Sequence, residues 1–102
     1  MSVTLCIDTS AVNTASIALE IDGKRYSQTS ESKVLKSQMV LPMIEDMLLE
    51  HKIKLTDITA ISVATGPGSF TGLRVGVSVA NALGYLLDIP VNGKKTLAIP
   101  TY

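Results

Sequence analysis

The chain has few of the residues that build covalent or metal-bound sites. Its 102 residues include one cysteine, one histidine and no tryptophan. Cys6 has no partner for an internal disulfide, which fits a reducing cytoplasm, and its setting in an apolar run favours a small buried side chain over a nucleophile. His51 has no second ligand at helical spacing, so no metal-ligand motif is present.

The chain also lacks an excess of charge of either sign. Nine basic residues balance nine acidic ones, so no overall field steers the chain toward nucleic acid or an anionic membrane. We expect any contact with RNA to be local or to come through a partner. The start of the chain has no basic or apolar leader pattern, which predicts no export signal and a cytoplasmic protein.

Hydrophobic residues make up 46% of the chain and charged residues 18%, which is typical of a single compact α/β domain. The most apolar segment, 72–87, carries Arg74 and Asn81 and is short for a bilayer, so we expect a buried helix and no membrane partner. Asp22-Gly23 is a strong signal for a two-residue hairpin turn.

The hydrophobic patterns predict a mixed five-stranded sheet in the order β-β-β-α-β-α-β, with its later strands parallel and joined by right-handed crossovers. The expected strands are 3–9, 15–21, 24–30, 58–65 and 89–92, and the expected helices are 37–51 and 72–87. Residues 96–102 have the pattern of the start of a further helix.

Both helices carry more apolar surface than one sheet face requires. In the first, the apolar residues cover an arc of about 200°, roughly twice a core-facing stripe, and Met39, Met43 and Met47 form an adaptable ridge at a spacing of four. These methionines are candidates for a partner interface. The alternative is that they fill the core of the domain itself.

The second helix repeats small residues every four positions, at Gly76, Ala80 and Gly84. This spacing makes a groove that another helix can approach closely. We therefore predict that the groove, together with Arg74, belongs to a partner interface. The alternative is that the groove only lets the helix lie close to its own sheet.

Two polar loops follow predicted strands. Asp8, Thr9 and Ser10 end the first, and Gly66, Gly68 and Ser69 follow the fourth, so carboxylate, hydroxyl and backbone N–H groups should meet at one edge of the sheet. Such an edge is a candidate anion, nucleotide or magnesium site.

The second loop lacks the Gly-Lys-Ser/Thr of a Walker A motif and is not a nucleophile elbow. A rigid corner that starts the helix is the competing interpretation, and no catalytic residue is predicted.

Three motifs occur in a recognisable order and spacing over nearly the whole chain. They are Ile7-Asp8-Thr9-Ser10, Leu41-Pro42-Met43-Ile44, and residues 66–76, which read Gly-Pro-Gly-Ser-Phe-Thr-Gly-Leu-Arg-Val-Gly. In these motifs the chain resembles the bacterial TsaB (YeaZ) family. Members of that family are non-catalytic partner proteins in the threonylcarbamoyladenosine modification of tRNA.

The resemblance implies an actin-like ATPase (ASKHA, RNase H-like) half-domain, with residues 1–102 matching the first domain of the family and the second domain absent. It implies docking to a TsaD-type catalytic subunit through both helices, with a TsaE-type ATPase as a further partner and tRNA contacted only indirectly. No cofactor is expected in this chain, and ATP and magnesium would belong mainly to the catalytic partner.

The chain departs from the family pattern where relatives show His-Ser-Glu and it has Lys36-Ser37-Gln38, so no role is carried over to these residues. The resemblance favours a scaffold in threonylcarbamoyl transfer. Two alternatives stay open, a weak ATP-binding and ATP-hydrolysing domain and a homodimeric structural module that uses the same helices.

Overall fold

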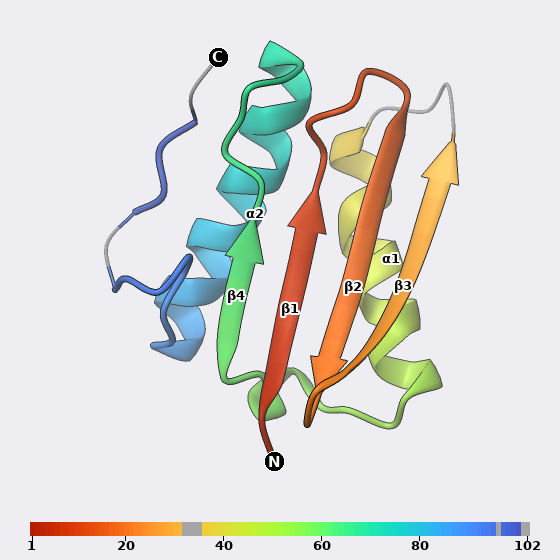
Figure 1. Ribbon diagram of the computed structural model, residues 1–102, viewed down its shortest axis with the longest axis vertical. Helices are drawn as coiled ribbons and strands as arrows, with labels where there is room; N and C mark the ends of the chain where they lie inside the picture. The colour runs from red at the N-terminus through yellow and green to blue at the C-terminus, as the bar shows by residue number, and fades with distance from the viewer. Residues whose placement is uncertain (32–35, 96, 101–102) are drawn as a thin grey trace.

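The computed structural model describes residues 1–31, 36–95 and 97–100, which form one mixed sheet with two helices on one of its faces (Figure 1). The sheet order is β3-β2-β1-β4, with β1 antiparallel to β2, β2 antiparallel to β3, and β1 parallel to β4. The elements are β1 (Val3–Asp8), β2 (Thr14–Ile21), β3 (Lys24–Glu31), α1 (Lys36–Glu50), the 3₁₀ turn η1 (Leu55–Asp57), β4 (Ala60–Val63) and α2 (Phe70–Leu87).

The β2–β3 hairpin confirms the turn predicted at Asp22-Gly23. Both residues have positive φ, 49° and 89°, as a two-residue type I′ turn requires. Ile21 and Lys24 flank the turn as a pair, and the register continues without interruption to Thr14 opposite Glu31.

Period-two alternation in β1 and β2 decides which face of the sheet is covered. The alternate residues that face the helices are almost fully buried. α1 packs mainly on β2, and α2 packs on β1 and β4, and both helices lie behind the sheet in Figure 1. These inward residues are Val3, Leu5, Ile7, Ala15, Ile17 and Leu19.

A buried hydroxyl joins β1 to α2. Thr9, which follows β1 and is 1% exposed, donates to the carbonyl of Gly72 and accepts from the backbone N–H of Gly76 at 3.1 Å. These two backbone groups are four residues apart, the spacing that bonds directly in a regular helix. The hydroxyl therefore lies between them, and α2 must approach β1 closely for it to do so.

The prediction of a fifth strand at 89–92 is wrong. Only Val91 pairs with β4, as an isolated parallel bridge to Ile61. Pro90 has no N–H to donate, and Asn92 and Gly93 turn the chain with φ of 53° and 79°. The sheet of the described residues therefore has four strands.

The side chain of Asn92 extends the pairing with β4 beyond the bridge at Val91. The amide of Asn92 accepts from the backbone N–H of Val63 at 2.8 Å and donates to the carbonyl of Val63 at 3.0 Å. The backbone N–H of Asn92 donates to the carbonyl of Ile61 at 2.8 Å, and the N–H of Ile61 donates to the carbonyl of Pro90 at 3.0 Å. The outer side of β4 is thus hydrogen-bonded at both Ile61 and Val63.

The helix predicted over 96–102 is not formed at 97–100. There the side chain of Asn81 holds the backbone of Ala98 through two hydrogen bonds, of 2.9 and 3.0 Å, in place of helical bonds. Residues 96, 101 and 102 lie outside the described part of the chain.

α2 has 18 residues and is apolar enough to fit a membrane span by length and composition alone. In this structure one side of it packs within the domain, and 39% of the helix is buried. Its buried residues contact the sheet and include Gly72, Leu73, Gly76, Val77, Ala80, Leu83 and Gly84.

Replacing Gly76 with alanine should lower the free energy of unfolding by about 2–3 kcal/mol, although alanine is the better helix former. A Cβ at this position would overlap the Thr9 hydroxyl, which two hydrogen bonds hold in place. Urea unfolding followed by circular dichroism measures the change. Ser78→Ala, on the exposed side of α2, is the control and should shift stability by less than about 0.5 kcal/mol; equal stability of the two variants would contradict this account of the contact.

Candidate functional site

The two polar loops meet, as predicted, at the carboxyl ends of the parallel strands β1 and β4. In the first loop, the Asp8 carboxylate accepts from the backbone N–H of Ser10 at 2.9 Å and from its hydroxyl at 2.6 Å. The backbone N–H of Ser69 in the second loop donates to the carbonyl of Ser10 at 2.8 Å. We call this contact between the loops the loop corner.

The loop corner is tight at Gly68. A Cβ built there would lie 2.7 Å from the carbonyl oxygen and 2.8 Å from the Cβ of Ser10, closer than real Cβ atoms come. Gly66, in the same loop, has φ of 127°, a conformation that L side chains rarely adopt. Both glycines are therefore explained by the geometry of the corner itself.

Several backbone groups at the start of α2 form hydrogen bonds within the chain. The Ser69 hydroxyl caps the helix by accepting from the N–H of Gly72 at 3.3 Å, and the Ser69 carbonyl accepts from Leu73 at 2.9 Å. Thr9 engages the N–H of Gly76. The N–H groups of Ser69, Gly72 and Gly76 thus donate to Ser10, Ser69 and Thr9. This geometry favours a packing corner, with Asp8 as an exposed carboxylate beside it.

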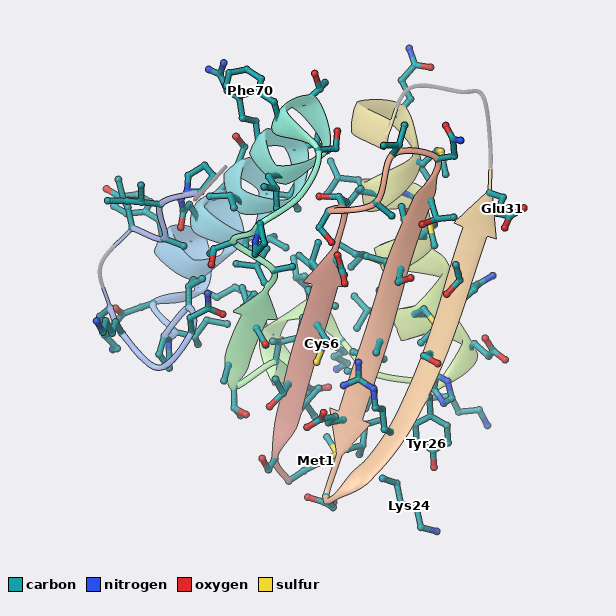
Figure 2. All side chains as sticks on the ribbon, turned by 45° about the horizontal axis from the view of Figure 1, so that its top comes forward. Met1, Cys6, Lys24, Tyr26, Glu31 and Phe70 are labelled. Carbon is teal, nitrogen blue, oxygen red and sulfur yellow. The ribbon has the colours of Figure 1, made fainter. Side chains whose placement is uncertain are left out.

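The face of the sheet away from the helices carries a trough of about 540 Å³ that sequence reasoning missed. Small and polar side chains of all four strands line it, and Cys6 lies in it (Figure 2). Burial raises the pKa of the Cys6 thiol, and the nearby Arg25 guanidinium, 3.5 Å from its sulfur, opposes that shift. Arg25 also forms an ion pair with Glu20 at 2.6 Å.

The methionine ridge is mostly core. Met43 is 8% exposed and Met47 is 2% exposed, so the prediction that they line a partner surface is wrong for these two side chains. Met39 is half-buried and packs against the same core. The sheet and α2 cover most of the apolar arc of α1 from two directions, whereas Leu41 and Leu49 of the same helix are 53% and 70% exposed.

The groove of small residues faces the sheet, so its prediction as a partner interface is also wrong. A Cβ at Gly84 would lie 2.5 Å from Cγ2 of Val91, and one at Gly76 would meet Thr9 and Ile7. Ala80 is fully buried. The alternative interpretation holds, because the small residues let α2 lie close to β1 and to the segment after α2.

Another part of α2 remains on the surface. Phe70, at the first turn, is 55% exposed and projects from the end of α2 in Figure 2, with the Arg74 guanidinium 5.3 Å from its ring centroid. Tyr85 and Leu86 are 86% and 74% exposed. A groove of about 450 Å³ runs along the same helix and is lined by Phe70, Thr71, Arg74, Val75, Ser78 and Val79. We call these residues, with Tyr85 and Leu86, the α2 outer surface.

Comparison with known proteins decides the family. The family model described as "TsaD: tRNA N6-adenosine threonylcarbamoyltransferase" matches residues 31–100. The chain is 39% identical over 93 residues to the tRNA threonylcarbamoyladenosine biosynthesis protein TsaB of Escherichia coli (strain K12), covering 91% of this chain and 40% of that protein. The chain belongs to the TsaD family, in its TsaB (YeaZ) group.

Solved structures agree with this membership of the TsaB group. YeaZ from Pseudomonas aeruginosa superposes with a TM-score of 0.83 at 37% identity, over 89% of this chain and 42% of that one. The chain thus spans about two fifths of the length of the relatives it matches. RuvC of T. thermophilus, in complex with a Holliday junction substrate, has a TM-score of 0.52 at 12% identity over 89% of this chain and 62% of that one, which shows a shared fold alone.

The described residues contain no cluster of three or more histidine, cysteine, aspartate or glutamate side chains placed to hold a metal ion. The Asp8 carboxylate is the acidic group of the loop corner, and one of its oxygens already accepts two hydrogen bonds from Ser10.

Gly68→Ala should lower the free energy of unfolding by about 2 kcal/mol, because the new methyl group would push the two loops apart against the Ser69–Ser10 hydrogen bond. Thermal and urea unfolding measure the loss. Thr71→Ala, at an exposed position one turn away, is the matched control. Wild-type stability of Gly68→Ala would show that the corner can open, which the packing account excludes.

Proposed function

We propose that this chain is a non-catalytic partner protein in the biosynthesis of threonylcarbamoyladenosine in tRNA and that it docks a TsaD-type catalytic subunit. Membership of the TsaB group supports the pathway. The α2 outer surface is the observation that carries the docking role. A scaffold of this kind acts in the cytoplasm and contacts tRNA only through the complex.

The composition of the α2 outer surface suits protein recognition. Aromatic side chains and arginine are enriched at binding hot spots, and this surface presents Phe70, Arg74 and Tyr85 on one helix. The partly buried Val75 and Val79 line the groove between the more exposed side chains. An apolar side chain of the catalytic subunit would fill this groove, with Arg74 available to an acidic group at its rim.

We assign the fold to the actin-like (ASKHA) class within the RNase H-like architecture. Three consecutive antiparallel strands, a parallel fourth strand and the likeness to RuvC support the assignment. We assign ATP and magnesium, and any contact with a TsaE-type ATPase, to the complex and mainly to its catalytic partner.

Ser78→Arg and Leu86→Glu should each weaken binding to the TsaD-type subunit by at least about tenfold. The first places a long charged side chain in the apolar groove, and the second buries an unpaired carboxylate at the contact. Isothermal titration calorimetry with purified TsaD-type subunit measures the affinity. Both positions are exposed, so the fold should be unaffected.

Val12→Glu is the control, because Val12 is an equally exposed apolar residue, 76% accessible, in the loop between β1 and β2. Wild-type affinity in both α2 variants would place the docking surface elsewhere. Binding heat with magnesium-ATP on the isolated chain would favour the ATPase alternative over the scaffold.

A further inference from the structure

The strand β3 forms one border of the sheet, at the right-hand side of Figure 1. Its eight residues pair with β2 alone within the described part of the chain, in a register without a bulge, and the strand contains no proline. α1 packs mainly over β2, so the helix layer leaves the outer border of β3 open. An exposed and regular edge strand of this kind is a template for an added strand.

The hairpin turn determines which backbone groups of β3 point outward. The two residues that flank a two-residue turn exchange hydrogen bonds with each other, and such pairs alternate along the hairpin. Lys24, which flanks the turn opposite Ile21, therefore directs its backbone groups toward β2, as do the even-numbered residues after it. The odd-numbered residues direct their N–H and C=O groups outward. These residues are Arg25, Ser27, Thr29 and Glu31.

Charge on β3 is confined to its two ends. Lys24 and Arg25 lie beside the turn and Glu31 ends the strand, and the labels of Lys24 and Glu31 in Figure 2 mark these ends. Charged side chains on an edge strand oppose pairing with other chains, but the residues between Arg25 and Glu31 carry no charge. The middle of the border is therefore open to a strand, and the ends determine which charges that strand must carry.

A pocket of about 380 Å³ lies beside this border, between β3 and the C-terminal end of α1. The ring centroids of Tyr26 and His51 are 4.4 Å apart and the two rings form one wall, while Glu50 supplies an acidic group. A long side chain with a positive head suits this pocket, because its aliphatic stem packs on the rings and its head reaches the carboxylate. The lining residues are Tyr26, Ser27, Gln28, Met47, Glu50 and His51.

An added strand would place alternate side chains over this pocket. Gln28 pairs with Ile17 of β2, which is fully buried beneath the helices, and directly opposed residues of neighbouring strands share a face. A residue opposite Gln28 therefore points to the helix side, where the pocket lies, and residues opposite Arg25 and Glu31 point to the open face. Arg25 already pairs with Glu20 at 2.6 Å, and its guanidinium has further donors for a second carboxylate.

We propose that β3 binds an extended segment of another protein as an added antiparallel strand. The segment would carry a basic residue opposite Glu31, an arginine or lysine opposite Gln28 that fills the pocket, and an acidic residue opposite Arg25. In an antiparallel strand these are the first, fourth and seventh residues of the segment. Main-chain bonds to the border give such a complex its affinity, and the pocket and the end charges give it specificity. The proposal is independent of the docking role of the α2 outer surface.

Synthetic peptides test the pairing. The probe is a fluorescein-labelled peptide of seven residues with lysine first, arginine fourth, glutamate seventh, and threonine or valine elsewhere, and fluorescence anisotropy with the full chain measures its affinity. Exchange of the first and last residues should weaken binding by about tenfold, because like charges then face Arg25 and Glu31. N-methylation of the third and fifth residues, whose N–H groups face β3, should weaken binding by at least about tenfold. N-methylation of the second and sixth residues, whose N–H groups face away, is the matched control.

A charge exchange in the pocket tests the position of the fourth residue. Glu50→Lys should weaken binding of the probe by about fivefold, because it replaces the attractive carboxylate with a like charge. The same variant should bind a peptide with glutamate in the fourth place more tightly than the wild type does. Glu45→Lys, exposed on the same helix outside the pocket, is the control and should leave both affinities unchanged.

Absence of saturable binding at millimolar probe would overturn the proposal. So would equal affinity for the two methylated peptides, since binding would then not use the border of the strand. Efficient disulfide formation between two Gln28→Cys chains, in a background with Cys6→Ser, would assign the border to a second copy and would also overturn the proposal. Unchanged probe affinity in Glu50→Lys would reject the register.

Discussion

The hydroxyl of Thr9 is the contact on which the arrangement of this domain depends. It is the buried polar side chain among the described residues, and it bonds the end of β1 to two backbone groups of α2. Since a buried hydroxyl without partners is costly, α2 must lie where Gly72 and Gly76 can reach it. That position fixes which residues of α2 face the sheet and which form its outer surface.

The loop corner extends the same constraint. Thr9 is followed by Ser10, whose carbonyl receives the backbone N–H of Ser69, and Ser69 caps α2. The glycine-rich motif thus connects a strand to a helix through contacts that leave little room for side chains. A glycine-rich loop before a helix suggests phosphate binding from sequence, but here the N–H groups of Ser69, Gly72 and Gly76 donate within the chain.

Local signals in the sequence predicted most of the fold. Asp22-Gly23 determined the hairpin, and alternation in β1 and β2 identified the buried face, because both depend on a few adjacent residues. The small residues of α2 correctly indicated a close approach, but spacing alone does not say what approaches, and the neighbour is Thr9, Ile7 and Val91.

The predicted strand at 89–92 failed for a related reason, because its apolar pattern is interrupted by Pro90 and by the positive φ of Asn92. The candidate site was harder to predict than the fold. Met43 and Met47 are core residues, and which side of a wide apolar arc is exposed depends on the tertiary contacts of α1. The family itself was evident from three short motifs, because these encode the loop corner, an inner turn of α1 and the first turns of α2.

The amide of Asn92 has a consequence for assembly. Its side chain hydrogen-bonds the N–H and the C=O of Val63, in the place that a neighbouring strand would take. The carbonyl of Pro90 and the N–H of Asn92 bond the backbone of Ile61. The backbone groups of Ile61 and Val63 on this border are therefore satisfied within the chain. A border whose N–H and C=O groups are satisfied in this way offers no template there for a strand of another chain.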